Sequence, residues 1–336
     1  SFGTSLLESG CEFCGACIDV CPVGALVETD NKWEKAQSVV SSVCTLCPVG
    51  CEMDIEVDSR GRAIRYVGKS NGINDGQLCY KGKFNTEMVN SRKRLKNPLV
   101  RREGVLQEAT WDEALELIRT TLPQYKGQSF GALAGNSVTN ESLYLLQKFT
   151  RVGMGSNNMD FIANHRSRLL DGLGRAIGMK GASGSYKDVI NSEAILLVSS
   201  NITEEQNVAA VPVKQAVKAG TKLVVVDSRE VEMTRYAAIW LRPRPGTEIA
   251  VITAMLRVIA DEALENHNFL NDNCDGLTEY KNTLWAFDLK RVSKMSGVSE
   301  EDIRSGARMI ATQGSTSILY ALDNIEAHLQ DQMVDA

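Results

Sequence analysis

The cysteines are the residues of this sequence whose type and spacing point most directly to chemistry. Nine occur in 336 residues, and eight of them lie within the first 79, at Cys11, Cys14, Cys17, Cys21, Cys44, Cys47, Cys51 and Cys79. Disulfides of a secreted protein would be spread over the chain, whereas thiols at gaps of two and three residues are typical of metal ligation. The ninth, Cys274, stands apart, and we expect an ordinary thiol there.

The first run reads Cys11-x2-Cys14-x2-Cys17-x3-Cys21-Pro. This spacing is that of bacterial ferredoxins, in which three thiolates bind one 4Fe–4S cluster and the fourth binds the other cluster of a pair. A second run of this kind is needed to complete both clusters, and the sequence has none. We therefore expect the missing run to lie upstream, in a longer protein of which this chain is a fragment.

The second run, Cys44-x2-Cys47-x3-Cys51-x27-Cys79, supplies four ligands and predicts a complete 4Fe–4S site. A zinc ribbon usually pairs two C-x2-C knuckles, so zinc is the weaker interpretation. Residues 53–57 and 63–67 alternate around the turn signal Asp-Ser-Arg-Gly, which predicts a hairpin. The hairpin would return Cys79 to the first three ligands.

The sequence around the second run resembles the molybdopterin oxidoreductases, which include formate dehydrogenase catalytic subunits and the large iron–sulfur subunit of respiratory complex I. The resemblance rests on CTLCPVGC, on LCYKGKF at 78–84 and on NSRKRLKNPLVR at 90–101. Upstream, SGCEFCGACIDVCPVGAL resembles the ferredoxin-like module that precedes the pterin domain in NAD-linked formate dehydrogenases. The family places a lysine between cluster and pterin, two residues after the fourth cysteine. The resemblance therefore implies a catalytic role for Lys81, which would otherwise be a solvated surface lysine.

The rest of the chain predicts an α/β body. Thr110 and Glu113 form a capping-box pattern that opens an amphipathic helix through Leu122. Strands are predicted at 130–134, 194–198, 223–226 and 318–321, with helices at 141–152, 208–219, 248–264 and 300–312. Alternating strands and helices predict a mostly parallel, doubly wound sheet of the molybdopterin oxidoreductase type behind small iron–sulfur modules.

Polar residues follow three of the expected strand ends, where such sheets bind ligands. They are Ser200, Asn201 and Glu204; Asp227 and Arg229; and Gly246, Thr247 and Glu248. Each group alone is typical of a plain strand-to-helix turn. Together they resemble the guanine-dinucleotide segments of the family, which read GSN-x-x-E, DPR and PGT-D. This sequence departs by Ser199 for Gly, Ser228 for Pro and Glu248 for Asp.

Residues 155–160 resemble the approach to the loop that carries the metal ligand in formate dehydrogenases. Those enzymes then have a cysteine or selenocysteine followed by histidine, whereas this chain has no cysteine in the loop. Ser167 is a conceivable substitute, and His165 and Arg166 are the nearest catalytic candidates. The alternative is that His165 and Arg166 are surface residues at the start of a helix.

Composition limits the classes of function. The formal net charge of −5 and the pI of about 5.5 argue against a nucleic-acid-binding protein. No apolar run is long enough for a membrane span, and the clustered thiols favour a reduced cytoplasm. The basic residues of 92–102 predict a solvated face, with phosphate binding as the alternative. We expect three domains: a ferredoxin-like segment at 1–37, a 4Fe–4S domain at 38–100 and a truncated α/β pterin-type body at 101–336.

These features predict an iron–sulfur electron-transfer subunit of a redox complex, with partner subunits linked to NAD(P)H, ferredoxin or quinone. Its cofactors would be 4Fe–4S clusters, and its pterin site would be vestigial because the loop lacks a cysteine ligand. The alternative is a catalytic formate dehydrogenase-like subunit with molybdopterin guanine dinucleotide and Mo or W. A free-standing ferredoxin-like carrier is the poorest interpretation, because it needs no large α/β body.

Overall fold

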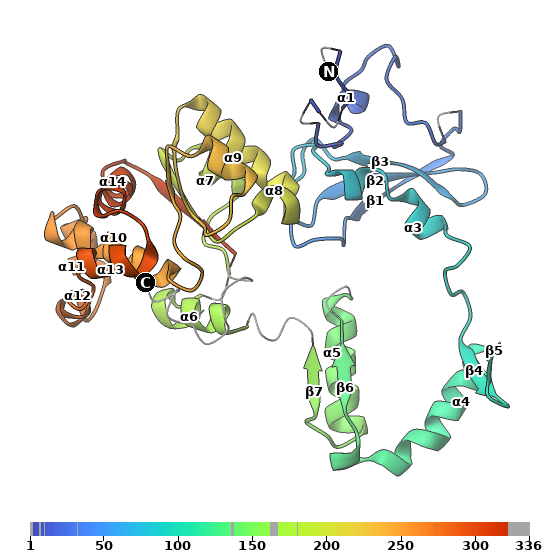
Figure 1. Ribbon diagram of the computed structural model, residues 1–336. Helices are drawn as coiled ribbons and strands as arrows, with labels where there is room; N and C mark the ends of the chain where they lie inside the picture. The colour runs from blue at the N-terminus through green and yellow to red at the C-terminus, as the bar shows by residue number, and fades with distance from the viewer. Residues whose placement is uncertain are drawn as a thin grey trace. The chain divides into compact units, whose positions relative to one another are not determined.

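The computed structural model describes residues 3–6, 8–9, 11–31, 33–135, 138–161, 167–179 and 181–321. Figure 1 shows the helices and strands along the chain, which divides into two compact units. The first comprises residues 1–46 and 50–165, and the second comprises residues 47–49 and 166–336.

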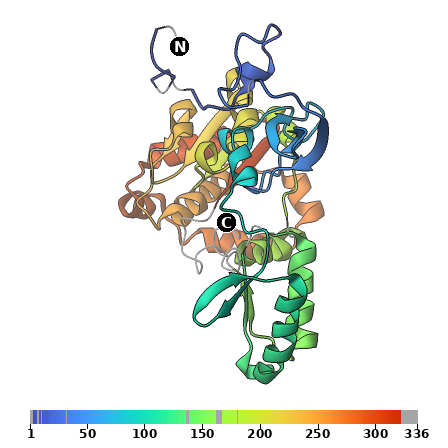
Figure 2. The same cartoon turned by 90° about the vertical axis from the view of Figure 1, so that its right-hand side faces the viewer.

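The first unit begins with a mostly irregular segment that contains one short helix, α1 (Ala16–Asp19) (Figure 2). A three-stranded antiparallel sheet follows, in the order β1 (Ser38–Val43), β2 (Glu52–Val57) and β3 (Ala63–Gly68). The predicted hairpin is confirmed as β2 and β3. The sequence did not predict β1, because all six of its residues are exposed and no burial pattern marks them.

The turn between β2 and β3 is organised by Asp58. Its Oδ1 accepts hydrogen bonds from the backbone N–H groups of Arg60 and Arg62, each at 2.9 Å, and the guanidinium of Arg62 bonds Oδ2 at 2.9 Å. These bonds, the backbone N–H of Arg62 first, lower the pKa of Asp58 from 3.8 to about 2. The carboxylate thus accepts hydrogen bonds from turn N–H groups that would otherwise bind water.

The lowered pKa of Asp58 predicts a pH dependence of the hairpin. Because folding lowers the pKa of Asp58, its ionised carboxylate stabilises the folded hairpin at pH values above the pKa of the unfolded chain. This stabilisation is lost as the pH falls from about 4 to about 2. Amide exchange of residues 52–68 should therefore accelerate over this range, beyond the intrinsic pH effect on exchange. In Asp58→Asn the additional acceleration should be absent, and a variant that retained it would place its origin elsewhere.

The remainder of the first unit consists of a hairpin, the helices α2 to α5 with short 3₁₀ turns, and a small parallel strand pair. Strands β4 (Leu99–Arg102) and β5 (Val105–Glu108) pair antiparallel. Helices α2 (Tyr80–Lys83) and α3 (Thr86–Asn90) precede them, and α4 (Trp111–Thr121), α5 (Asn140–Lys148) and the 3₁₀ turns η1 (Leu122–Tyr125) and η2 (Gly127–Ser129) follow. Strands β6 (Ala132–Ala134) and β7 (Met159–Phe161) are parallel.

The sequence predicted the start of α4 correctly but placed the end of the next helix too late. Both bonds of the capping box of Thr110 and Glu113 are present at the start of α4. The expected helix 141–152 is α-helical only to Lys148 and ends in a π-helical turn, η3 (Phe149–Gly153). There the hydroxyl of Thr150 donates to the carbonyl of Leu146 at 2.8 Å, a bond that competes with regular helical geometry.

The second unit contains a four-stranded parallel sheet in the order β10-β9-β8-β11. The strands are β8 (Ala194–Val198), β9 (Lys222–Val226), β10 (Ile239–Leu241) and β11 (Thr316–Tyr320). The chain steps outward from β8 to β9 and β10, and then returns to the opposite side of β8 to form β11. Connections between parallel strands are right-handed, so those that run outward from β8 and the one that returns to β11 cover opposite faces of the sheet. The sheet is therefore doubly wound, as predicted.

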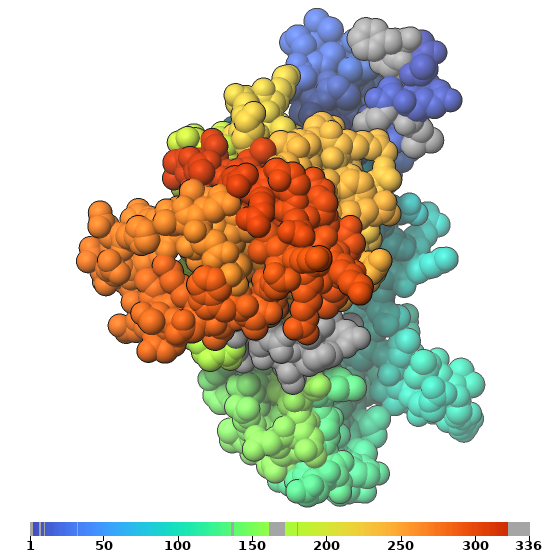
Figure 3. Space-filling model, turned by 60° about the vertical axis from the view of Figure 1, so that its left-hand side comes forward, coloured from blue at the N-terminus to red at the C-terminus, as the bar shows by residue number. Residues whose placement is uncertain are grey.

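Helices cover this sheet. Between β8 and β9 runs α9 (Asn207–Ala219), and α10 (Glu248–Asp261), α13 (Leu289–Ser296) and α14 (Glu300–Ala311) lie between β10 and β11. The core includes Val224, Val226 and Leu241 from the strands with Val251 and Ile303 from the helices, all fully buried. The residues from about 250 to 320 form one packed surface (Figure 3).

The second unit also contains α6 (Ser167–Ile177). Its remaining elements are shorter: α7 (Tyr186–Ile190), α8 (Ile202–Glu205), η5 (Glu232–Tyr236), α11 (His267–Asn273) and α12 (Leu277–Leu284).

Candidate functional site

Two cysteines of the second run, Cys44 and Cys51, are brought together by β1 and β2. Val43 pairs with Glu52, so Cys44 and Cys51 lie side by side just beyond the strand ends. The backbone N–H of Cys44 donates to the carbonyl of Cys51 at 2.8 Å, and both cysteines are buried. Cys47 lies in the loop between them and is partly exposed. Strand pairing therefore supplies the proximity that the spacing predicted.

Cys79, the fourth cysteine of the run, directly precedes α2. Helix α2 packs against β3, and a Cβ placed on Gly82 would lie 3.7 Å from the Sγ of Cys44. The helix after Cys79 therefore passes close to the first ligand.

This donor set fits an iron–sulfur cluster. Four thiols without histidine or carboxylate suit Fe–S ligation. Among the described residues, no three His, Cys, Asp or Glu side chains converge on a single metal ion. A 4Fe–4S cluster places one thiolate on each iron, so its ligands stand farther apart than those of a single ion.

The first run is wrapped by backbone turns. The N–H of Phe13 donates to the Sγ of Cys11 at 3.4 Å. Phe13 and Gly15 have φ values of 53° and 75°, in the left-handed region that turns the chain sharply. Amides directed at thiol sulfur are a feature of cluster-binding loops, because they stabilise negative charge on sulfur.

The last cysteine of the first run, Cys21, has a similar environment. Its pKa is lowered, chiefly by a hydrogen bond from the backbone of Leu26, with smaller contributions from the amides of residues 23–25. These amides favour the thiolate, which is the form that binds iron. The eight ligand assignments remain predictions that this geometry supports.

The two lysines near Cys79 have opposite environments. Lys81, the residue to which the resemblance assigns a role, is exposed, and its Nζ lies 5.9 Å from the ring centroid of Tyr80. Lys83 is only 1% exposed. Sequence reasoning missed Lys83, because nothing local distinguishes two lysines separated by one glycine.

The polar residues after the parallel strands lie along one edge of the sheet, which we call the carboxyl edge (residues 199–204, 227–229 and 242–248). The N–H of Ser199 donates to the carbonyl of Val226 at 2.8 Å, and the N–H of Asp227 donates to that of Leu241 at 3.3 Å. Adjacent strands therefore end at the same level. The segment after β8 also lies where the strand order reverses, which is where doubly wound sheets bind ligands.

Asp227 and Arg229 form an ion pair on this edge. Asp227 is 2% exposed and accepts from the backbone N–H of Arg229 at 2.8 Å and from its guanidinium at 3.1 and 3.2 Å. The pKa of Arg229 is raised, first by this side-chain hydrogen bond. A buried acid beside a 40% exposed guanidinium can orient a ribose hydroxyl and an anionic group together.

The third segment of the carboxyl edge leads into α10. Gly246 has a φ of 84°, the hydroxyl of Thr247 donates to the carbonyl of Arg244 at 2.6 Å, and Glu248 is the buried first residue of the helix. The Arg244 guanidinium in turn donates to the carbonyls of residues 294 and 295. Thr203, after β8, donates to Asn201 at 3.3 Å, and Glu204 is exposed. These loops are held in place by internal bonds.

Ser199 predicts a stability effect. Its φ of 48° is left-handed, at the position where the resemblance expects glycine. Ser199→Gly should relieve ~1–2 kcal/mol of backbone strain and cost ~0.5–1 kcal/mol of chain entropy. We expect a net gain of ~0.5–1 kcal/mol in the free energy of unfolding, measured in urea. Ser200→Gly, at a position without a positive φ, should destabilise instead, and equal effects would disprove the explanation.

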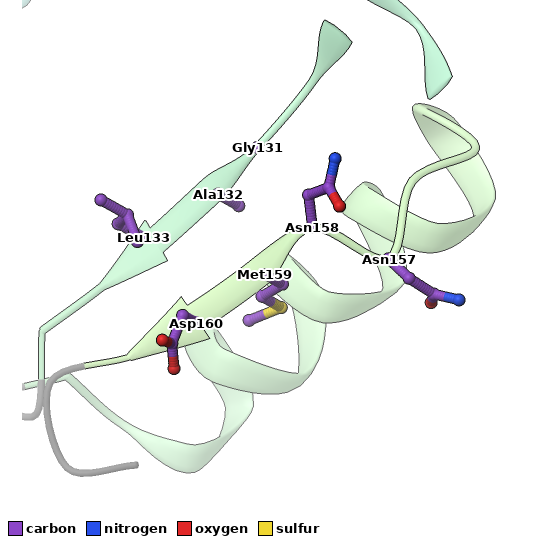
Figure 4. A pocket seen from close by; sticks show the side chains of 7 residues that line it. All are labelled: Gly131, Ala132, Leu133, Asn157, Asn158, Met159 and Asp160. Atoms are coloured by element: carbon purple, nitrogen blue, oxygen red, sulfur yellow. The ribbon is translucent and has the colours of Figure 1, made fainter. Parts of the chain in front are cut away.

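The expected metal-ligand loop lies largely outside the described residues. His165 and Arg166 are among the undescribed residues, and Ser167 is known only as the first residue of α6. Immediately before the loop, residues 131–133 and 157–160 line a hollow beside β6 and β7 (Figure 4). The roles of His165 and Ser167 therefore stay predictions. No helix in the described part of the chain is long and apolar enough to cross a membrane.

Comparison with protein families gives three matches. "Molybdopterin oxidoreductase" matches residues 94–331, "Molybdopterin oxidoreductase Fe4S4 domain" matches residues 37–91, and "4Fe-4S binding domain" matches residues 6–27. Both cysteine runs therefore lie in 4Fe–4S-binding segments, and the α/β body lies in the pterin-type region.

Curated relatives agree. The chain is 35% identical to the F420-dependent formate dehydrogenase 1 subunit alpha of Methanococcus maripaludis, over 84% of this chain and 42% of that protein. It is 30% identical to the NADPH-Fe(3+) oxidoreductase subunit alpha of Geobacter sulfurreducens, over 93% of this chain and 38% of that protein. The chain thus spans less than half the length of these relatives.

A solved structure shares the fold. Acetylene hydratase from Pelobacter acetylenicus superposes with a TM-score of 0.72 at 23% identity, covering 88% of this chain and 43% of that one. Together with the family match over most of the sequence, this similarity identifies the chain as a member of the molybdopterin oxidoreductase family, with iron–sulfur segments at its N-terminal end.

Proposed function

We propose that this chain is the iron–sulfur electron-transfer part of a molybdopterin-family oxidoreductase complex. The observation that carries the proposal is the convergence of Cys44, Cys51 and the helix after Cys79 in the first unit, which also contains the amide-lined first run. When bound, 4Fe–4S clusters supply one-electron acceptors and donors at these two places.

The chain's own residues would hold the clusters and set their potentials. Burial of Cys44 and Cys51 excludes water from one side of the second site. Backbone amides stabilise sulfur charge around Cys11 and Cys21. Both effects control how readily a cluster accepts an electron. Within this proposal, the segments 1–37, 38–100 and 101–336 serve as first cluster segment, second cluster domain and pterin-type body.

The partners would be other subunits of a cytoplasmic redox complex. The two relatives described above are both named as alpha subunits, one F420-dependent and one linked to NADPH. These names support a partner that handles NAD(P)H, ferredoxin or a similar low-potential carrier.

A second candidate is a catalytic formate dehydrogenase-like subunit, and the carboxyl edge favours it. Ser200, Asn201, Asp227 and Arg229 follow two neighbouring strand ends, with Gly246, Thr247 and Glu248 after the next, and such an edge would suit a guanine dinucleotide of molybdopterin. Such a centre would supply two-electron chemistry with Mo or W. The absence of a cysteine between residues 155 and 175 argues for the relay instead.

Metal and pterin analysis of the whole protein, purified without oxygen, tests the proposal. Iron and sulfide near stoichiometry for 4Fe–4S clusters, without pterin, would support the electron-transfer subunit. Stoichiometric Mo or W with a guanine pterin would establish the catalytic alternative. A protein without iron–sulfur clusters would refute both.

A further inference from the structure

Lys83 is the largest of the fully buried side chains among the described residues. It lies four residues after Cys79 and ends α2. Burying an ammonium group costs several kcal/mol unless charged or polar partners surround it. A lysine kept in this position therefore calls for a functional or structural explanation.

Its ammonium group is bound from two segments distant in sequence. The Nζ donates to Oδ1 of Asp19 at 2.5 Å and to the carbonyl of Tyr66 at 2.8 Å. A second carboxylate, Glu28, approaches to 3.8 Å. Asp19 lies in α1, between two ligands of the first cysteine run, whereas Tyr66 belongs to β3. The lysine thus connects the two iron–sulfur segments.

The methylene stem of Lys83 makes the same connection. A Cβ placed on Gly15 would lie 2.8 Å from Cγ of Lys83 and 3.0 Å from its Cε. The backbone of the first run therefore lies directly on the lysine stem, and only glycine leaves room for it. The contact combines packing with charge pairing.

Without Lys83, the acidic partners would be poorly matched. One Glu28 side-chain oxygen, Oε1, is buried and has no hydrogen-bond partner among the described residues, and the Lys83 ammonium lies 3.8 Å from it. Asp19, 25% exposed, would lose the ammonium group with which it forms an ion pair. Residues 11–28, here called the ferredoxin-like segment, would then bury acidic charge against β3 without compensation.

We propose that Lys83 is a positioning residue that holds the ferredoxin-like segment against the 4Fe–4S domain and provides a buried positive charge between the two cysteine runs. The proposal rests on the proposed electron-transfer function. Fixing both segments on one lysine fixes the separation between the two cluster sites. A positive charge there also favours the reduced, more negative state of a nearby cluster.

Hydrogen–deuterium exchange of the whole protein tests the positioning role, and it does not require clusters to be present. In Lys83→Met, amides of residues 15–28 should exchange about tenfold faster or more, whereas β2 and β9 should stay unchanged. Lys69→Met is the matched control, since Lys69 is 32% exposed and its Nζ lies 3.9 Å from Asp54. Unchanged exchange at residues 15–28 in Lys83→Met would overturn the proposal.

A second variant covers the case in which Lys83→Met does not fold. Asp19→Asn removes the closest partner but keeps a polar side chain of similar size. It should accelerate exchange in the same residues, and the double variant should exchange no faster than Lys83→Met alone, because the Asp19–Lys83 pair is already lost in that variant. Additive effects would show that Lys83 and Asp19 act separately, and would overturn the proposal.

The charge role has its own readout in the reduction potential of the clusters in the whole protein. Lys83→Met should shift a cluster potential to more negative values, and Lys83→Arg, which keeps the charge, should retain the potential. Equal potentials in these two variants would overturn the charge role. A wild-type protein without clusters would refute the proposed function, while the exchange result would still decide whether Lys83 holds the segments together.

Discussion

Replacing Cys51 with alanine should remove one 4Fe–4S cluster, a loss of about four irons per chain. Cys51 is 5% exposed and its carbonyl accepts the N–H of Cys44, so no water or solvent thiol can readily take its place. Electron flow through the chain should fall by more than tenfold, because the second site would be interrupted.

Iron and sulfide analysis with electron paramagnetic resonance of the reduced protein measures this loss. Cys274→Ala is the matched control, because Cys274 is an exposed cysteine in the second unit. It should keep the full iron content and unchanged spectra. If Cys51→Ala retained both clusters, the ligand assignment of the second run would be wrong.

Replacing Asp227 with alanine should have the second large effect, a loss of guanine-dinucleotide retention at the carboxyl edge. The change removes a buried acceptor of three hydrogen bonds from Arg229. We expect pterin content to fall below about a tenth of wild type, where wild type carries pterin, since an acid at this place orients ribose hydroxyls. The free energy of unfolding should fall by ~1–2 kcal/mol, a value reduced because the guanidinium is partly exposed.

Pterin and iron measured in one preparation separate this effect from general damage. Iron content should stay unchanged, because the cysteine runs lie elsewhere in the sequence. Asp261→Ala is the control: it removes a comparable ion pair with Arg257, within α10. Loss of pterin in both variants, or in neither, would contradict a specific role for Asp227.

Short-range features of the sequence determined much of this protein. Cysteine spacing predicted two iron–sulfur segments, which the family matches confirm. The capping box of Thr110 and Glu113 was predicted because both of its hydrogen bonds join residues three apart. The strand at 194–198 was predicted at its full length because all five residues are apolar and buried. These signals need only neighbours in the sequence.

Long-range contacts decided the rest. Lys83 and Lys81 are equivalent in sequence, and only the packing of α1 and β3 around α2 buries one of them. Strand β1 has no buried face and exists because β2 pairs with it. The left-handed Ser199 and the ion pair at Asp227 lie on one edge because three strands end at the same level. Residue types and their spacing determined which groups could do chemistry. The tertiary structure decided which of these groups lie close together. Burial and proximity depend on contacts between segments that are distant in the sequence, and no local pattern reveals them.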